Sequence, residues 1–374
     1  MPIDEHDLRQ LQRALELAHG AIGRSDPNPR VGCVLADAAG RTIGEGATQR
    51  TGDAHAEVMA LHAAQSRGGS TRGGTAWVSL EPCSHHGRTP PCCDALIAAG
   101  LRRVVVATVD PNPLVAGAGL QRLRDAGIVV DVASGELARQ AFELNIGFFS
   151  RMRRGLPWVR CKMAASLDGR TALADGRSRW ITGEAARADG HAWRRRAAAI
   201  LTGVGTALAD NPRLDVRHVV TEVQPLRVVV DSRLRLAAHA RVYDPPGAAL
   251  VFCAQVDAAA EAALRARGVE VIERPADDGS VDLLAVLQEL AVRGVNELHV
   301  EAGPTLTGAL VRAGLVDELL VYLAPKLLGE GRGMVDVRLT ELSQAWPLRF
   351  ESIQTIGVDL RIVARRTDAP DGLP

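Results

Sequence analysis

Short apolar runs alternate with helical stretches along almost the whole chain, and this alternation limits the possible folds more than any other feature of the sequence. Repeated strand and helix at this spacing favours α/β architecture, with parallel or mixed sheets covered by helices. In the first half we expect strands at residues 31–37, 42–47, 75–80, 104–109 and 128–133, and helices at 4–23, 54–67, 91–99 and 120–126. Asp53 is placed to cap the second of these helices.

The second half of the chain repeats the α/β pattern. We expect strands at 158–164, 200–202, 226–231, 248–252, 269–272 and 298–301, helices at 184–196, 257–267, 281–293 and 304–313, and edge strands, antiparallel to one another, at 318–323, 348–356 and 358–364. The basic, breaker-containing stretch Arg151–Pro157 marks the expected domain boundary. The 374 residues therefore divide into domains at 1–150 and 151–374, with a loose tail at 368–374.

Charge and composition exclude several classes of partner. Lys and Arg number 44, as do Asp and Glu, so no global field draws the chain to nucleic acid or to an anionic membrane. Five Trp, two Tyr and five Phe leave few platforms for stacking a run of bases. The charged N-terminus and the lack of a long apolar stretch predict a cytoplasmic protein with reduced cysteines. Its partner should be a small molecule.

One group of residues has the types and order that a zinc deaminase needs. His55 and Glu57 open an expected helix, Cys83 follows a strand, and Cys92 begins the next helix. One imidazole and two thiolates can hold zinc and leave a fourth position for water, while the glutamate moves protons. The N–H groups of a helix N-terminus also favour the thiolate form of Cys92. The group therefore predicts a zinc-dependent hydrolytic site.

Other interpretations of these residues remain open from the sequence. His85 or His86 could fill the fourth position and make the zinc structural, and Cys93 is an alternative to Cys92. Cys33, Cys161 and Cys253 are expected to be buried small apolar residues.

The cysteine spacing also points to a family. Generic zinc deaminases have two residues between their cysteines, whereas this chain has eight between Cys83 and Cys92. The segment Leu80–Cys92, with the sequence LEPCSHHGRTPPC, resembles the deaminase domain of the bifunctional riboflavin-biosynthesis deaminase/reductases. The segment Asn28–Gly32 is similar to the substrate-side loop of that family. This resemblance implies a cytidine-deaminase-like α/β/α domain.

Motifs in the second half support the same resemblance. Lys162–Arg170, Ser178–Thr182, Ala209–Pro212 and Glu301–Thr305 are similar to the family's reductase domain, which has a dihydrofolate-reductase-like α/β fold. The residues alone indicate a strand that ends at Glu301 and a helix N-terminus suited to phosphate. The similar turn at 203–206 lacks the full dinucleotide fingerprint, so a Rossmann domain is not supported.

The resemblance implies roles for individual residues. Glu57 is the catalytic acid/base, and His55, Cys83 and Cys92 are the zinc ligands. NADPH contacts fall on Ala164, Trp180, Thr206, Asp210, Ser232, Gly303, Pro304, Thr305, Leu306, Thr307, Gly308 and Ala309, and substrate contacts on Asn28, Ser178, Arg194, Leu214, Arg217 and Glu301. Guanidinium groups suit a ribose phosphate, but the run Arg194–Arg196 does not reveal which arginine faces the site, and Trp180 could be ordinary core.

The implied function has two steps. Zinc-dependent hydrolytic deamination of 2,5-diamino-6-(5-phosphoribosylamino)pyrimidin-4-one is followed by NADPH-dependent reduction of its ribosyl side chain to ribityl. A nucleotide or tRNA-base deaminase with an unrelated appended domain is the alternative enzyme, and a zinc-stabilised binding module is the alternative outside enzymes. The family resemblance also implies a homo-oligomer.

Overall fold

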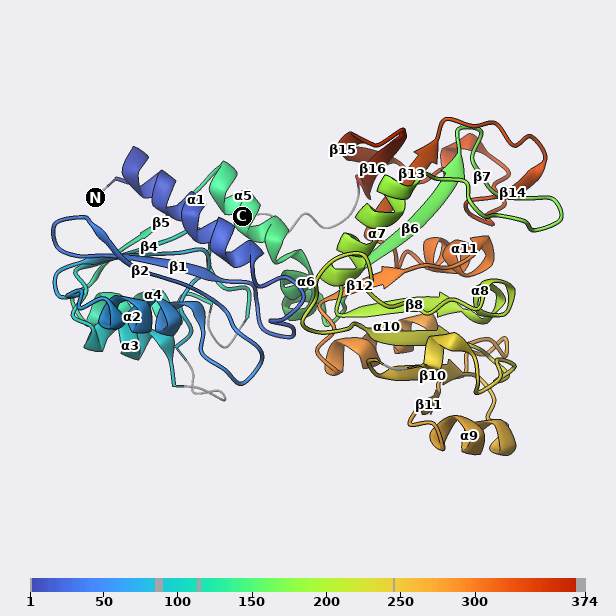
Figure 1. Ribbon diagram of the computed structural model, residues 1–374, viewed down its shortest axis with the longest axis horizontal. Helices are drawn as coiled ribbons and strands as arrows, with labels where there is room; N and C mark the ends of the chain where they lie inside the picture. The colour runs from blue at the N-terminus through green and yellow to red at the C-terminus, as the bar shows by residue number, and fades with distance from the viewer. Residues whose placement is uncertain (1, 85–89, 113–115, 245, 368–374) are drawn as a thin grey trace. The chain divides into compact units, whose positions relative to one another are not determined.

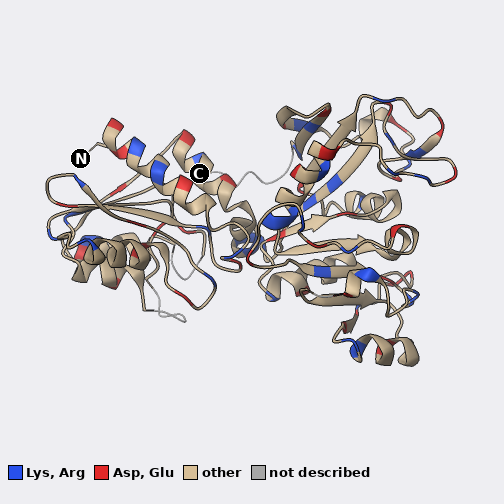
Figure 2. Cartoon of the chain, in the orientation of Figure 1, with Lys and Arg blue, Asp and Glu red and all other residues tan. Residues whose placement is uncertain are grey.

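The chain folds into two compact α/β units, one ending at Gly155 and the other beginning at Leu156 (Figure 1). A computed structural model describes residues 2–84, 90–112, 116–244 and 246–367. Basic and acidic residues are interspersed over both units (Figure 2). None of the helices in these described ranges is both long and apolar enough to cross a membrane.

The N-terminal unit is a three-layer α/β/α structure around a five-stranded sheet of order β2-β1-β3-β4-β5. Strands β1 and β2 are antiparallel, β1 and β3 are antiparallel, and β3, β4 and β5 are parallel. Helices α1 and α5 cover one face, whereas α2, α3 and α4 lie on the other (Figure 1). The elements are α1 (Glu5–His19), β1 (Gly32–Ala36), β2 (Thr42–Ala47), α2 (Ala56–Ser66), β3 (Thr75–Val78), α3 (Cys92–Ala98), β4 (Arg103–Val106), α4 (Ala118–Asp125), β5 (Val129–Val132), α5 (Glu136–Leu144) and α6 (Ile146–Arg154).

Two glycines on β2 bring helix α2 unusually close to the sheet. A Cβ at Gly44 would lie 2.2 Å from the Ala60 carbonyl oxygen, and one at Gly46 would lie 2.3 Å from the Ala56 carbonyl oxygen. Both are far inside van der Waals contact, so only glycine lets the α2 backbone rest on the strand. Because α2 begins at Ala56, this contact fixes the position of its first turn.

The C-terminal unit is built on a nine-stranded sheet of order β11-β10-β9-β8-β12-β6-β13-β16-β15. The strands from β11 to β13 run parallel, and β16 and β15 complete the edge in antiparallel pairing. The elements are β6 (Trp158–Ser166), β7 (Arg170–Leu173), α7 (Glu184–Arg196), β8 (Ala199–Gly203), α8 (Val204–Asp210), β9 (Leu226–Val230), η1 (Arg241–Tyr243), β10 (Ala249–Cys253), α9 (Ala258–Arg265), β11 (Glu270–Glu273), α10 (Leu283–Val292), β12 (Glu297–Val300), α11 (Pro304–Arg312), β13 (Glu318–Ala324), β14 (Gly331–Gly333), η2 (Leu342–Gln344), β15 (Leu348–Ile356) and β16 (Asp359–Arg366).

Alternate residues of the parallel strands form two apolar layers, as the sequence pattern predicts for a sheet that is buried on both faces. Leu201 and Val228 pack with residues of α10 and α11, including Leu290. Their neighbours Ile200 and Val229 pack on the opposite face. The sheet is therefore a rigid platform whose strand ends can hold a site.

The predicted strands and long helices are confirmed within a few residues, but several local expectations are wrong. Arg151–Arg154 is the last turn of α6 and not a linker. Asp53 does not cap α2, since His55 is its N-cap residue and no side chain caps it. Helices α5, α6 and α8 and the small pair β7–β14 were not expected. The tail at 368–374 lies outside the described residues.

The close packing of α2 on β2 makes a stability prediction. Gly46→Ala should lower the free energy of unfolding by about 1–3 kcal/mol, because the new methyl group forces the helix and strand apart. Gly190→Ala in α7 is the matched control, since a Cβ there meets no atom within 4 Å. That control should be neutral or gain up to about 1 kcal/mol from helix propensity. Urea unfolding of the purified variants measures both, and equal stability of Gly46→Ala and wild type would contradict the packing argument.

Candidate active sites

Three sulfur and nitrogen donors converge in the N-terminal unit. His55 is the N-cap residue of α2, Cys83 follows β3, and Cys92 is the first residue of α3. The His55 Nδ1 atom lies 3.7 Å from the Cys83 sulfur and 3.4 Å from the Cys92 sulfur. One ligand atom from each residue lies within 4.8 Å of the others. This donor set of one imidazole and two thiols fits a zinc ion with one open position.

The strand directions explain why residues so far apart in the sequence meet. Strands β2 and β3 are both antiparallel to β1, so they point the same way. The chain reaches His55 after β2 and Cys83 after β3, at the same edge of the sheet. The first backbone N–H of α3, that of Cys92, then donates to the Cys83 sulfur at 3.3 Å. This hydrogen bond favours the thiolate that a metal requires.

The neighbouring thiol of Cys93 takes no part in this cluster. Its Sγ donates to the carbonyl oxygens of Pro82 at 3.3 Å and Gly119 at 3.5 Å. Burial raises the pKa of the Cys93 thiol, which keeps it protonated. The structure thus places Cys92, not the alternative Cys93, beside His55. The proposed closing ligands His85 and His86 lie outside the described residues.

Glu57 lies in the first turn of α2, against the same cluster. Its side chain is buried, with 3% of the residue exposed, and it interacts with the Cys92 thiol. Burial raises the pKa of Glu57 to about 7, and the charge of Cys83 adds to this effect. A carboxyl group with a pKa near neutrality can both accept and release a proton. The arrangement suits acid/base chemistry.

The loop that carries Asn28 is tied to the segment before His55. Asn28 is half-buried, and its N–H donates to the Ser25 carbonyl oxygen at 2.8 Å. The Thr51 hydroxyl donates to the carbonyl oxygens of Asp26 at 3.0 Å and Ser25 at 3.3 Å. These hydrogen bonds hold the loop against the chain that leads into the metal cluster.

In the C-terminal unit, the residues expected to bind the dinucleotide follow adjacent strands. Thr206 lies in α8 directly after β8, and Gly303 caps α11 directly after β12. The Gly303 N–H donates to the Thr206 hydroxyl at 2.9 Å, which joins the two turns. The first N–H groups of α11 have no side-chain cap and begin with Pro304 at the N1 position. They form a helix N-terminus suited to a phosphate group.

Other expected cofactor residues surround this edge. Ala164 lies near the carboxyl end of β6, and Ser232 follows β9. Trp180 is 66% exposed and is not ordinary core; the Arg187 guanidinium stacks 4.5 Å from its ring centre. Arg179 donates to the Asp210 carbonyl oxygen at 2.7 Å and so links the loop of Ser178 and Trp180 to the end of α8. No described contact places a ligand here.

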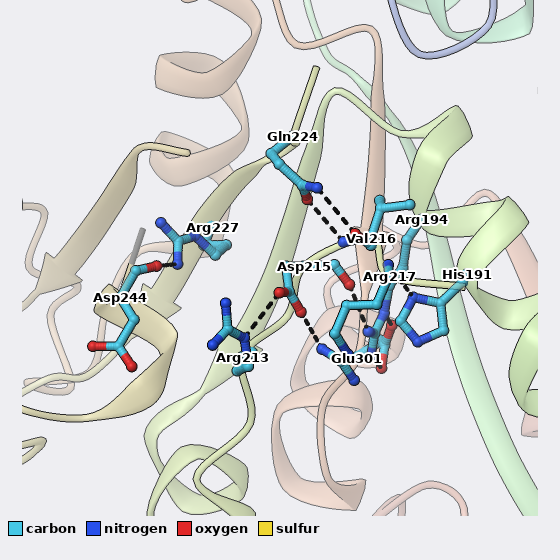
Figure 3. A network of polar contacts seen from close by, with 10 residues as sticks. All are labelled: His191, Arg194, Arg213, Asp215, Val216, Arg217, Gln224, Arg227, Asp244 and Glu301. Carbon is cyan, nitrogen blue, oxygen red and sulfur yellow. Dashed lines mark hydrogen bonds and ion pairs between the residues drawn. The ribbon is translucent and has the colours of Figure 1, made fainter. Parts of the chain in front are cut away.

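Arg194 answers the question that the arginine run left open about direction. Its guanidinium donates to both carboxylate oxygens of Glu301, at 2.5 and 2.8 Å, and to the Asp215 carbonyl oxygen at 3.0 Å (Figure 3). Although burial opposes ionisation, Arg194 holds the pKa of Glu301 well below its usual range. Arg196 instead pairs with the buried Glu297 at 2.8 Å. Of these two, Arg194 is therefore the one that meets Glu301.

Arg217 lies on the loop that follows α8. The carboxylate of the buried Asp215 accepts from Arg217 on one oxygen and from Arg213, at 2.9 Å, on the other (Figure 3). Leu214 is buried and has a positive φ of 51°, which turns the loop back on itself. The structure thus gathers Arg194, Arg217, Leu214 and Glu301 in one network.

Sequence reasoning missed several residues of this network. Asp215 and Gln224 have no motif of their own, and His191 lies on α7 without a pattern that marks it. Asp215 could have been suspected, because it alternates with Arg213 and Arg217 and a carboxylate between arginines is a common way to orient them. Lys162 stood in a quoted motif without a role; burial lowers its pKa, and the Glu301 carboxylate opposes that shift.

Comparisons with known proteins agree with both halves of this description. Residues 4–108 match the cytidine and deoxycytidylate deaminase zinc-binding region, and residues 157–362 match the RibD C-terminal domain. The riboflavin biosynthesis protein RibD of Escherichia coli is 46% identical, over 94% of this chain and 96% of that protein. The chain belongs to the RibD family. The members of this family are bifunctional deaminase/reductases of riboflavin biosynthesis, and so is this chain.

Other relatives cover the same length. RibD of Aquifex aeolicus is 38% identical over 97% of this chain and 99% of its own. The solved structure of Acinetobacter baumannii RibD has a TM-score of 0.87 and 39% identity, covering 97% of this chain and 99% of that chain. A Thermotoga maritima diaminohydroxyphosphoribosylaminopyrimidine deaminase/5-amino-6-(5-phosphoribosylamino)uracil reductase has a TM-score of 0.86 and 31% identity, covering 96% and 99%.

Family membership decides between the functions that the sequence left open. The expected cytidine-deaminase-like domain and C-terminal reductase domain are both confirmed. The RibD C-terminal match means that the second unit is not an unrelated appended domain, so a nucleotide or tRNA-base deaminase is not favoured. The zinc-binding match also agrees with the donor set of His55, Cys83 and Cys92.

The two adjacent cysteines of α3 provide a test of the ligand set. Cys92→Ser should lose bound zinc and deaminase activity, because a hydroxyl group is a much poorer zinc ligand than a thiolate. Cys93→Ser, the matched control, should keep one zinc per chain, since the Cys93 sulfur faces two carbonyl oxygens. Metal content measured by mass spectrometry of the purified variants distinguishes them. Zinc loss in Cys93→Ser alone would assign the ligand to the wrong sulfur.

Proposed function

We propose that the N-terminal unit hydrolytically deaminates 2,5-diamino-6-(5-phosphoribosylamino)pyrimidin-4-one and that the C-terminal unit reduces the ribosyl side chain of the product with NADPH. The observation that carries the first step is the buried Glu57 beside the donor cluster His55, Cys83 and Cys92. The Thermotoga relative, whose title names both reactions, supports this substrate. A cytoplasmic location and homo-oligomerisation stay predictions.

In the deaminase step the three donors would hold zinc, and Glu57 would manage the protons. Zinc bound by one histidine and two cysteines acts as a Lewis acid that makes water nucleophilic near neutral pH. Glu57 takes a proton from the attacking water as the new C–O bond forms at the amino-bearing ring carbon. The same carboxyl group then delivers protons to the ring nitrogen and to the leaving ammonia. Its burial excludes bulk water from these transfers.

In the reductase step the protein mainly orients two ligands. NADPH supplies the hydride that is added to C1′ of the ribosyl group. The N–H groups of α11 and the hydroxyl of Thr206 lie where a phosphate of the cofactor can be held. Arg194 and Arg217 would bind the ribose phosphate, and the ionised Glu301 would accept a hydrogen bond from the substrate. These contacts align C1′ with the hydride donor.

The central experiment is incubation of the purified protein with the diamino substrate, with and without NADPH, and identification of the products by mass spectrometry. Without NADPH we expect the oxo product and free ammonia. With NADPH we expect the ribitylamino product. Bound metal without release of ammonia would instead indicate a structural zinc and would overturn the proposed deaminase site.

Glu57→Gln tests the acid/base role. The variant should keep one zinc per chain but lose deaminase turnover by about 10²–10⁴-fold, because an amide cannot accept or deliver the proton. Glu16→Gln, on the exposed face of α1, is the control and should be unchanged. Ammonia release and metal content are measured on the same samples. Near-normal turnover of Glu57→Gln would remove Glu57 from the mechanism.

Arg194→Lys tests the reductase site. A lysine cannot contact both oxygens of Glu301 and the Asp215 carbonyl oxygen at once, so we expect KM for the reductase substrate to rise by about tenfold or more. Arg265→Lys on α9, where the arginine side chain is 55% exposed, is the control. Oxidation of NADPH is followed with the deaminated intermediate as substrate. An unchanged KM would exclude Arg194 from the substrate site.

A further inference from the structure

The loop from Asn211 to Arg217 is held in an unfavourable backbone conformation. Asn211 and Leu214 both have positive φ values, 42° and 51°. Such values are rare for residues with side chains and persist only where the surroundings enforce them. The loop has neither helix nor strand pairing in this stretch. Side chains from other elements must therefore supply the contacts that fix it.

Gln224 supplies the contact at the centre of the loop. Its Oε1 accepts from the Val216 N–H at 2.8 Å, and its Nε2 donates to the Val216 carbonyl oxygen at 3.0 Å (Figure 3). A primary amide is the side-chain group that offers a neutral acceptor and donor side by side, so it satisfies both backbone groups of one residue. Val216 is itself buried, which makes unsatisfied backbone groups costly there.

The residues on both sides of Val216 touch the proposed substrate site. The Asp215 carbonyl oxygen accepts from Arg194 at 3.0 Å, and the Arg217 N–H donates to His191 Nδ1 at 3.2 Å. Gln224 therefore fixes the one residue between two that are bound from α7. Its own position is set by Pro225 and by β9, whose next residues enter the core of the sheet.

We infer that Gln224 is a positioning residue of the reductase, which sets the selectivity for the phosphorylated substrate by holding Arg217 through Val216. This inference rests on the proposed function of Arg217 as a ligand of the ribose phosphate. Gln224 does not itself touch the guanidinium groups in the described contacts. It acts by fixing the backbone from which Arg217 extends, while the Asp215 carboxylate orients the guanidinium.

The test compares two substrates in each variant. One is 5-amino-6-(5-phosphoribosylamino)uracil, and the other is the same compound after removal of its phosphate. Gln224→Met keeps the length of the side chain and removes both hydrogen bonds. We expect KM for the phosphorylated substrate to rise by about 10- to 100-fold, the usual effect of a misplaced binding group. The kcat value and KM for the dephosphorylated substrate should change little.

A second variant and a control keep the inference testable if Gln224→Met folds poorly. Gln224→Glu retains the acceptor for the Val216 N–H but cannot donate to its carbonyl oxygen, so its KM for the phosphorylated substrate should lie between those of wild type and Gln224→Met. Gln288→Leu, on the exposed face of α10, should match wild type. Deaminase activity and thermal unfolding of each variant report on folding.

Equal changes in KM for both substrates, or a loss of kcat alone, would overturn the positioning role and indicate a general structural defect. Arg217→Ala separates this failure from failure of the proposed function. If Arg217→Ala loses the preference for the phosphorylated substrate but the Gln224 variants keep it, the positioning inference is wrong and the phosphate site stands. If Arg217→Ala keeps the preference, the proposed phosphate ligand itself is wrong.

Discussion

Both sites depend on the direction of neighbouring strands. Parallel strands deliver their carboxyl ends to one edge of a sheet, so residues distant in the sequence become neighbours there. In the N-terminal unit, β2 leads to His55 and β3 leads to Cys83, at one edge. In the C-terminal unit, β8 leads to Thr206 and β12 leads to Glu301. The helices that follow add N–H groups and first-turn side chains, so binding groups and framework are set by the same topology.

Local patterns explain why much of this was predictable. The metal donors lie at junctions that hydrophobic periodicity reveals, and their chemistry is strongly constrained by residue type. Arg194 could be named from the family resemblance, but its direction depends on the rotation of α7, which spacing within a basic run does not determine. Gln224 could not be found, because its partners are the backbone groups of Val216 in an irregular loop. Asp53 failed as a cap because the helix begins later, after His55.

The pair of Arg194 and Glu301 shows how charge can be kept in a poorly solvated place. A carboxylate that loses water is stable only with good partners, and removal of one partner leaves an uncompensated charge. Arg194 and His299 both approach Glu301, with His299 Nε2 3.4 Å from its nearer oxygen. Burial lowers the pKa of His299, so this imidazole is neutral and the arginine provides the charge balance. The ionised state of Glu301 is thus a property of the folded unit and not of ligand binding.

Cys92 and Cys93 are chemically identical, yet they have opposite surroundings. Successive residues of a helix point about 100° apart, so the orientation of α3 about its own axis decides which thiol meets His55. That orientation is set by the apolar face of the helix, where Leu96 is fully buried. Discrimination between two equivalent ligands is therefore made by a hydrophobic contact on the far side of a short helix. A change in core packing could alter metal loading without touching any donor atom.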